Sequence, residues 1–204
     1  MNCLIIDTST DLCLIAIAKN NQIISENVFS HQNLLSKNLL PAIQHLLQEV
    51  GLNVSDLNLV AVGIGPGSYT GTRVGAAIGK TLAFGLNIEV IPFCSPLAFL
   101  PDRDGSFAFL LPARSGDYFV LQGSSSLREI TQKSAALLSP DAMITATETA
   151  DFLICTSMDS LPEKLKEKLH IKPSVNLPAL TKYLKSALPL APEHIELKYL
   201  HTPY

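Results

Sequence analysis

"VGIGPGSYTGTRVG", residues 62–75, places five glycines and a proline between an apolar run and a series of small residues. The apolar run, Leu57–Gly63, predicts a buried strand, and Thr70–Leu86 predicts a helix. Glycine tolerates the backbone angles of a sharp turn, and Ser68 or Thr70 is a typical N-cap residue. The stretch therefore predicts a strand, a tight turn and a helix, which is the repeating unit of an α/β fold.

The sequence on either side extends this unit to a mixed sheet. Pro41 lies inside the first predicted helix, so we expect a kink there or a helix that starts later. The resulting order β-β-β-α-β-α-β is typical of the ribonuclease H-like lobe used by actin-type folds. The further elements are a helix at Leu34–Val50 and strands at Cys3–Ile6, Leu12–Ala18, Gln22–Phe29 and Ile88–Ile91, the last ended by Pro92.

Prolines and charged residues mark a domain boundary near residue 101. We therefore expect two lobes, residues 1–101 and residues 102–204, with the second smaller and degenerate and the last residues packing back on the first. The predicted elements of the second lobe are strands at Phe107–Leu111, Tyr118–Gln122, Phe152–Cys155 and Glu196–Leu200, and helices at Leu161–Leu169 and Leu177–Leu188.

The composition excludes several classes of protein. A chain of 204 residues with 47% hydrophobic and 16% charged residues is not disordered. Its net charge of −3 and lack of clustered Lys and Arg argue against nucleic-acid binding by this chain alone. The four cysteines have no zinc-site spacing and are expected to be buried thiols. Without a signal peptide or a long apolar run, a cytoplasmic protein is expected.

The glycine turn fails both common phosphate-loop templates. In G-x-G-x-x-G, the third glycine position falls on Ser68 or Thr70, depending on the frame. In the Walker template four residues separate the first glycine from G-K-[ST], but only three separate Gly75 from Gly79-Lys80-Thr81. Two interpretations stay open: the amides of the turn hold an anion, or the glycines only allow a tight turn.

The turn "DTST" at Asp7–Thr10 is the other candidate site. In actin-type folds a carboxylate at this first hairpin helps to hold a nucleotide, whereas an Asp here also fits a structural Asx turn. The candidate residues of such a vestigial nucleotide-type site are Asp7, Thr8, Ser9, Gly63, Gly65, Gly67 and Ser68.

Small residues also recur every four positions in the following helix, at Gly71, Gly75, Gly79 and Ala83. Each interior glycine costs about 1 kcal/mol relative to alanine, so a compensating close contact is expected. The contact is either another subunit, which we favour, or the first helix of this chain. A leucine at Gly75 is accordingly expected to block pairing and to leave the fold intact.

Four segments together resemble the bacterial TsaB family, also called YeaZ: "LIIDTST", "HQNLLSKNLLPAI", "VGIGPGSYTGTRVGAAIGKTLAFGL" and "KYLHTPY". The resemblance is close over residues 1 to 99 and weak beyond them. It implies an actin-like ATPase fold of two lobes. It also implies a part in the threonylcarbamoyl modification of adenosine 37 in tRNAs that read ANN codons.

In that family the homologue TsaD is catalytic and TsaE is a small ATPase, so the resemblance implies a scaffold that pairs with both, or with itself when alone. It implies no catalytic residue, metal or cofactor held by this chain, with ATP or ADP and metal in the complex. The implied interface comprises Leu35, Leu39, Ile43, Gly71, Arg73, Gly75, Gly79 and Ala83. Two departures, Pro112-Ala113-Arg114 and Tyr199-Leu200-His201, put the function of the second lobe in doubt.

A non-catalytic accessory subunit of tRNA threonylcarbamoylation is therefore the leading hypothesis. The alternatives are an independent ATP-dependent phosphotransferase or hydrolase that uses Asp7 and the glycine turn, and a peptidase. For the peptidase, the sequence offers no G-x-S-x-G around Ser68 and no acid–base pair.

Overall fold

The structure is a computed structural model that describes residues 1–10, 12–30, 35–100, 104–113, 116–126, 130–155, 161–166 and 177–198. The chain forms two compact units. The first consists of Met1–Leu97 together with Thr181–Tyr204, and the second of Ala98–Leu180. The division falls at residues 97 and 98, against the expected 101, and the returning segment assigns residues from Thr181 onward to the first unit.

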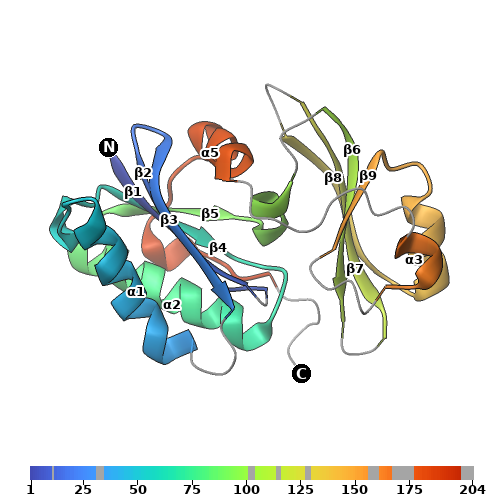
Figure 1. The fold of residues 1–204 in the computed structure, drawn as a ribbon, viewed down its shortest axis with the longest axis horizontal. Coiled ribbons are helices and arrows are strands. Elements are labelled where there is room, and N and C mark those ends of the chain that lie inside the picture. Colours follow the sequence, from blue (N-terminus) through green and yellow to red (C-terminus); the bar gives the residue numbers. More distant parts are fainter. Residues whose placement is uncertain are drawn as a thin grey trace. The chain divides into compact units, whose positions relative to one another are not determined.

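The first unit is built on a five-stranded sheet with the order β3-β2-β1-β4-β5 (Figure 1). The strands β1, β2 and β3 pair antiparallel, and β4 and β5 join β1 in parallel. This arrangement is that of the ribonuclease H-like lobe, and with it the expected actin-like α/β fold is confirmed. The strands are β1 (Asn2–Asp7), β2 (Leu12–Lys19), β3 (Gln22–Ser30), β4 (Leu59–Gly63) and β5 (Glu89–Phe93).

Two helices, α1 (Leu35–Glu49) and α2 (Tyr69–Leu86), cover one face of this sheet (Figure 1). The even-numbered side chains of β1 and β4, such as Ile6 and Val62, join the same buried cluster as the inner faces of both helices. A short 3-10 helix, η1 (Val54–Asp56), connects α1 to β4. The first unit therefore has its main core between the sheet and this helix pair.

Two prolines lie inside regular elements, and the kink expected at Pro41 stays a prediction. The helix α1 begins at Leu35 and runs through Pro41 to Glu49, so it does not start later. Pro92 does not end β5, which continues to Phe93. Because β5 is the last strand of the sheet, a residue without an N–H can be placed there with no loss of a ladder hydrogen bond on its outer side.

The second unit contains a four-stranded sheet with the order β8-β7-β6-β9. Its strands are β6 (Gly105–Pro112), β7 (Tyr118–Ser125), β8 (Ile130–Leu138) and β9 (Phe152–Cys155). Helices α3 (Pro140–Thr147) and α4 (Glu163–Lys166) follow β8 and β9, and α5 (Leu177–Ser186) carries the chain back to the first unit. One core of this unit lies among Ala108, Val120, Met143, Leu153 and Leu165.

The sequence analysis missed β8 and α3. The signal for α3 is nevertheless present, because Ser139 is its N-cap and Pro140 takes its first turn. The strand predicted at Glu196–Leu200 is wrong for residues 196–198, which form no strand, and residues 199–200 lie outside the described ranges. Residues 167–169 of the predicted helix also lie outside them.

Candidate functional site

The first hairpin turn and the glycine turn lie in direct contact. Asp7 ends β1, and its Oδ1 accepts a hydrogen bond of 2.8 Å from the Ser9 N–H, which is the expected Asx turn. Gly63 ends β4 beside it, where a Cβ would overlap the Asp7 carboxyl group. Because β1 and β4 are neighbouring parallel strands, Asp7 and the glycine turn lie at the same edge of the sheet.

This chain's own backbone occupies the space between the two turns. The Ser68 N–H donates to the Ser9 carbonyl at 2.6 Å, and Thr8 Oγ1 donates to the Gly71 carbonyl at 2.6 Å. A Cβ on Gly67 would overlap the Ser9 carbonyl. A phosphate site needs backbone N–H groups that point at the ligand, but those of Ser9 and Ser68 are used inside the protein. We call the space between the two turns the slot; in this conformation the chain's own backbone closes it.

Asp7 is sealed inside this contact. Its side chain is 3% exposed, and burial raises the pKa of the carboxyl, an effect opposed by the hydrogen bond from Ser9. Among the described residues, Asp7 Oδ2 and Ser9 Oγ are buried without a hydrogen-bond partner. In this conformation the carboxyl group of Asp7 serves the turn as a hydrogen-bond acceptor.

The N-terminus of α2 is capped as expected. Ser68 is the N-cap residue, and its Oγ accepts the Gly71 N–H at 3.2 Å. Gly65 has φ +87°, an angle that favours glycine, which explains one of the glycines by the turn alone. A tight turn followed by a capped helix therefore accounts for Gly65 and Ser68.

The small-residue face of α2 packs against the sheet. A Cβ on Gly71 would overlap the Thr8 carbonyl, one on Gly75 would overlap Thr8 Oγ1, and one on Gly79 would overlap a methyl group of Val62. The interpretation that these glycines contact a partner is therefore wrong, because the hairpin turn and β4 of this chain already lie against Gly71, Gly75 and Gly79. The nearest atoms at these three positions do not come from the first helix. Ala83 is completely buried within the chain. The close approach of α2 to the first hairpin turn and to β4, which only glycine permits, compensates for the cost of these glycines.

The predicted interface residues of α1 are also internal. Leu35, Leu39 and Ile43 belong to the core between α1 and the sheet. Of the whole predicted interface, only Arg73 is exposed, where it stacks on the Tyr69 ring at 3.9 Å. A partner that binds these helices must meet their opposite faces.

Those opposite faces carry apolar side chains that the sequence analysis missed. Leu40 on α1 is 49% exposed, and Phe84 on α2 is 79% exposed. Arg73, Ala77, Thr81 and Phe84 form an exposed stripe at helical spacing, on the side of α2 away from the glycines. The spacing of the glycines could have revealed these exposed side chains. A row of glycines marks the buried side of a helix, so the side chains on the opposite side face solvent.

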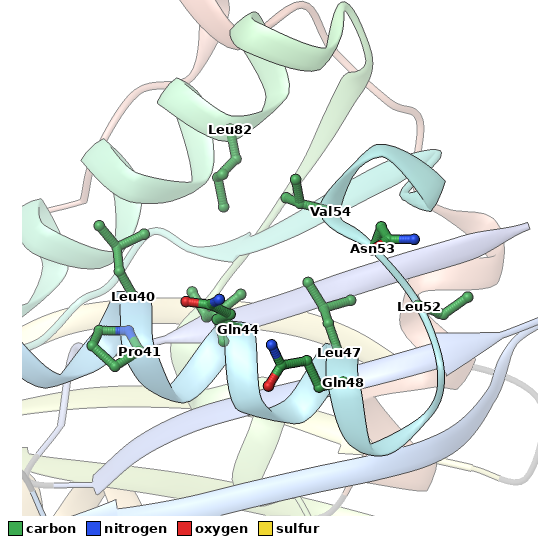
Figure 2. Close-up of a pocket in the computed structure, with 10 residues that line it drawn as sticks. Leu40, Pro41, Gln44, Leu47, Gln48, Leu52, Asn53, Val54 and Leu82 are labelled. Atoms are coloured by element: carbon green, nitrogen blue, oxygen red, sulfur yellow. The ribbon is translucent and has the colours of Figure 1, made fainter.

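A groove of about 490 Å³ runs between α1, the loop after it and α2 (Figure 2). Figure 2 shows Leu40 rising from α1 and Leu82 descending from α2 toward the same space. None of its lining side chains is charged: Leu40, Pro41, Ile43, Gln44, Leu47, Gln48, Leu52, Asn53, Val54 and Leu82. The groove is apolar with an amide rim and offers no group for acid–base or nucleophilic chemistry.

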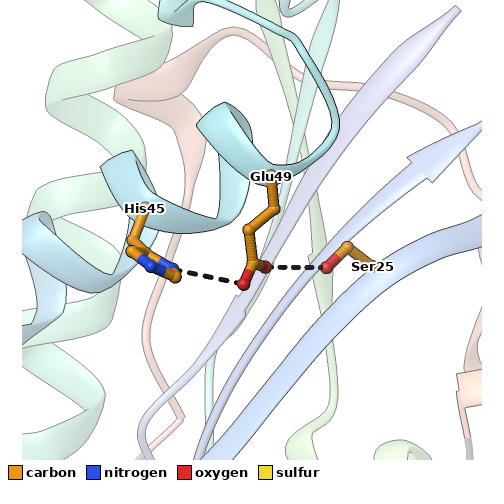
Figure 3. A network of polar contacts seen from close by, with 3 residues as sticks. All are labelled: Ser25, His45 and Glu49. Atoms are coloured by element: carbon orange, nitrogen blue, oxygen red, sulfur yellow. Dashed lines mark hydrogen bonds and ion pairs between the residues drawn. The ribbon is translucent and has the colours of Figure 1, made fainter.

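Ser25, His45 and Glu49 form a surface network that contains the residue types of a hydrolase triad (Figure 3). Their order is wrong for that chemistry. Ser25 Oγ donates to Glu49 Oε2 at 3.4 Å, and His45 Nδ1 lies 3.4 Å from Glu49 Oε1. A nucleophilic serine requires histidine between it and the acid, whereas here the acid lies between them. This network gives the peptidase alternative no support.

The remaining titratable side chains of the described ranges bear on metal binding and on unusual pKa values. In these ranges, no three His, Cys, Asp or Glu side chains are grouped so that they could hold a metal ion. All four cysteines are free and buried as expected, and burial, with the charge of Asp7, raises the pKa of Cys13 to about 12. None of the described helices has the length and apolarity needed to cross a membrane. Arg114 and residues 199–201 lie outside the described ranges.

Comparison with known proteins gives one family. A family model described as "TsaD: tRNA N6-adenosine threonylcarbamoyltransferase" matches residues 22–134, more than half of the chain. The tRNA threonylcarbamoyladenosine biosynthesis protein TsaB of Haemophilus influenzae is 40% identical over 89 residues, which are 44% of this chain and 37% of that protein. The Bacillus subtilis protein of the same name is 37% identical over 122 residues, with 58% and 53% covered. The chain thus spans about half the length of these relatives, or less.

Solved structures agree on the fold. The protein described as YeaZ from Pseudomonas aeruginosa superposes with a TM-score of 0.76 at 23% identity, over 98% of this chain and 99% of that one. A second structure, described as an uncharacterized protein with similarity to peptidase YEAZ, from the same organism, has a TM-score of 0.79 at 23% identity and the same coverage. At this identity the likeness concerns the fold alone.

Proposed function

The chain belongs to the family that the TsaD model describes, in its TsaB (YeaZ) branch, and on this basis we propose a non-catalytic accessory subunit of tRNA threonylcarbamoylation. Its part is in the modification of adenosine 37 in tRNAs that read ANN codons. The observation that carries the non-catalytic role is the closed slot, where the Ser9 and Ser68 amides serve this chain's own turns. The chemistry then lies with a partner of the TsaD type.

The pairing surface of this proposal is the outer face of the helix pair. Phe84 is mostly exposed to water. Burial of its ring against a partner would therefore contribute hydrophobic free energy to binding. The exposed stripe on α2 and the uncharged groove beside α1 suit an apolar helical face of TsaD. When TsaD is absent, a second copy of the chain takes its place, and TsaE joins the assembled pair. Contact with tRNA is made through the complex.

Replacement of Phe84 by Asp tests this surface. A charge in the middle of an apolar contact must lose its water without gaining a partner, so the dissociation constant for TsaD from the same organism should rise at least about tenfold, or 1.4 kcal/mol. The measurement is titration calorimetry of the purified chains. Leu188→Asp is the matched control, because Leu188 is 82% exposed and lies on neither helix.

Two results would contradict different parts of the proposal, one the pairing surface and the other the accessory role. If Phe84→Asp and Leu188→Asp bind TsaD with equal affinity, the interface lies elsewhere on the chain. No complex between the unaltered proteins, together with normal tRNA modification in cells that lack this chain, would refute the accessory role.

ATP with Mg²⁺ should leave the melting temperature of the isolated chain unchanged. The physical reason is the closed slot, since a ligand that binds only the folded state stabilises it in proportion to its occupancy, by about 2.7 kcal/mol at 100 times the dissociation constant. Differential scanning fluorimetry with and without nucleotide checks this result. A saturable rise in melting temperature would instead favour the independent phosphotransferase or hydrolase.

A further inference from the structure

The chain passes between its two units twice, and both passages are tied to one turn of the first unit. It leaves after Leu97 and returns at Thr181. Just before it leaves, the Ser95 N–H donates to the Gly65 carbonyl at 3.0 Å, and Ser95 Oγ accepts the Gly65 N–H at 3.0 Å. Ser95 is completely buried. The outgoing segment therefore satisfies both backbone groups of Gly65.

The returning segment also reaches this turn. Leu190 pairs with Val90 at the outer edge of β5 through hydrogen bonds of 2.9 and 2.7 Å. Ile195 then enters the core beneath α2, where its carbonyl accepts a hydrogen bond of 3.4 Å from Lys80 Nζ. Finally, the Lys198 N–H donates to the Ile64 carbonyl at 2.7 Å.

Gly65 is enclosed by these two segments. A Cβ at this position would overlap the Lys198 carbonyl, so the returning backbone lies directly against the Gly65 Cα. Two residues further on, Gly67 and Ser68 begin the contact with Ser9 and the N-cap of α2. The turn is thus a junction of the outgoing segment, the returning segment and the helix that carries the exposed stripe.

We propose that the Ile64–Gly65 turn is an anchor through which the folding state of the second unit controls the order of the N-terminus of α2. Ser95 and Lys198 hold the turn only while their own segments are ordered. Each segment continues into residues 98–180, whose folding limits the conformations that the segment can adopt. Loosening of the second unit therefore weakens the tie at Ser95 most directly, because Ser95 lies just before the exit at Leu97, whereas Leu190 and Ile195 also hold the returning segment on the first unit. This inference concerns the isolated chain and does not depend on the proposed tRNA function.

Amide hydrogen exchange of the full chain, read by mass spectrometry, tests the anchor. Met143→Ala opens a cavity in the core of the second unit, since Met143 is completely buried there. Exchange in peptides that cover residues 64–70 should accelerate about tenfold, while exchange in β1 and β2 stays as in the unaltered protein. Leu137→Ala is the control, because Leu137 is on β8 of the same unit but 40% exposed.

Acceleration confined to residues 98–180 would overturn the proposal, and so would equal acceleration of β1, β2 and the turn. If Met143→Ala does not fold, the unaltered chain decides the question in low concentrations of urea. The amides of residues 64–70 should then open with the same urea dependence as those of β6 and β7. If they follow β1 and β2 instead, the turn belongs to the sheet and is no anchor for the second unit.

Discussion

Gly71→Ala should destabilise the first unit by about 2 kcal/mol or more, although alanine is the better helix former. The added methyl group overlaps the carbonyl oxygen of Thr8, which is backbone and cannot rotate away. Either the first hairpin turn or the start of α2 must move, which breaks the hydrogen bond from Thr8 Oγ1 to Gly71. Urea denaturation followed by far-UV circular dichroism measures the loss, since the chain has no tryptophan for fluorescence.

Gly85→Ala on the same helix is the matched control and should have the opposite sign. No atom lies within 4 Å of a Cβ at Gly85, so only the gain in helix propensity remains, up to about 1 kcal/mol. If both variants are stabilised, α2 does not pack on Thr8 as described. The same packing corrects the expectation for Gly75→Leu, which would force a branched side chain against Thr8 and damage the fold together with any pairing.

Asp7→Asn should stabilise the protein at pH 8 by about 1 kcal/mol or more, because a neutral amide replaces a carboxyl whose charged form is disfavoured by burial, and its oxygen can still accept the Ser9 N–H. Burial raises the pKa of Asp7 above its ordinary value of 3.8, so the folded state holds this proton more tightly than the unfolded chain. The stability associated with the neutral acid is therefore complete below pH 3.8 and is lost as the pH rises through the higher pKa of the folded state.

Urea denaturation of both proteins between pH 4 and pH 8 measures this effect. The difference in free energy of unfolding between Asp7→Asn and the unaltered protein should grow with pH and become small at the acid end. Glu26→Gln, which removes an exposed carboxylate from β3, corrects for the change in net charge. A difference that is the same at every pH would show that Asp7 does not titrate between the folded and unfolded states in this range.

The first unit was predictable because its signals are local. Apolar runs, the Ser68 cap and the Asx turn at Asp7 each depend on a few neighbouring residues, and the structure has all of them close to the predicted positions. The second unit was harder for the same reason. Its strand β8 contains Gln132, Lys133 and Ser134, so its pairing with β7 is decided by the partner strand and not by its own alternation.

The candidate site shows where such local reasoning ends. The spacing of Gly71, Gly75 and Gly79 correctly predicted that another part of the structure approaches α2 closely, but it does not specify which part. A glycine row has the same appearance in sequence whether a strand or another subunit covers it. The exposed Phe84, by contrast, is visible only when the buried face has been assigned.

By itself, the sequence determined the class of fold, the family and the absence of a standard phosphate loop, because each depends on residue types at short spacing. The tertiary structure alone decided that Thr8 and Val62 fill the glycine face, that Ser9 closes the slot, and that Ser95 and Lys198 meet at Gly65. These contacts join residues far apart in the chain, and no local pattern specifies which distant backbone group will occupy the space that a missing side chain leaves.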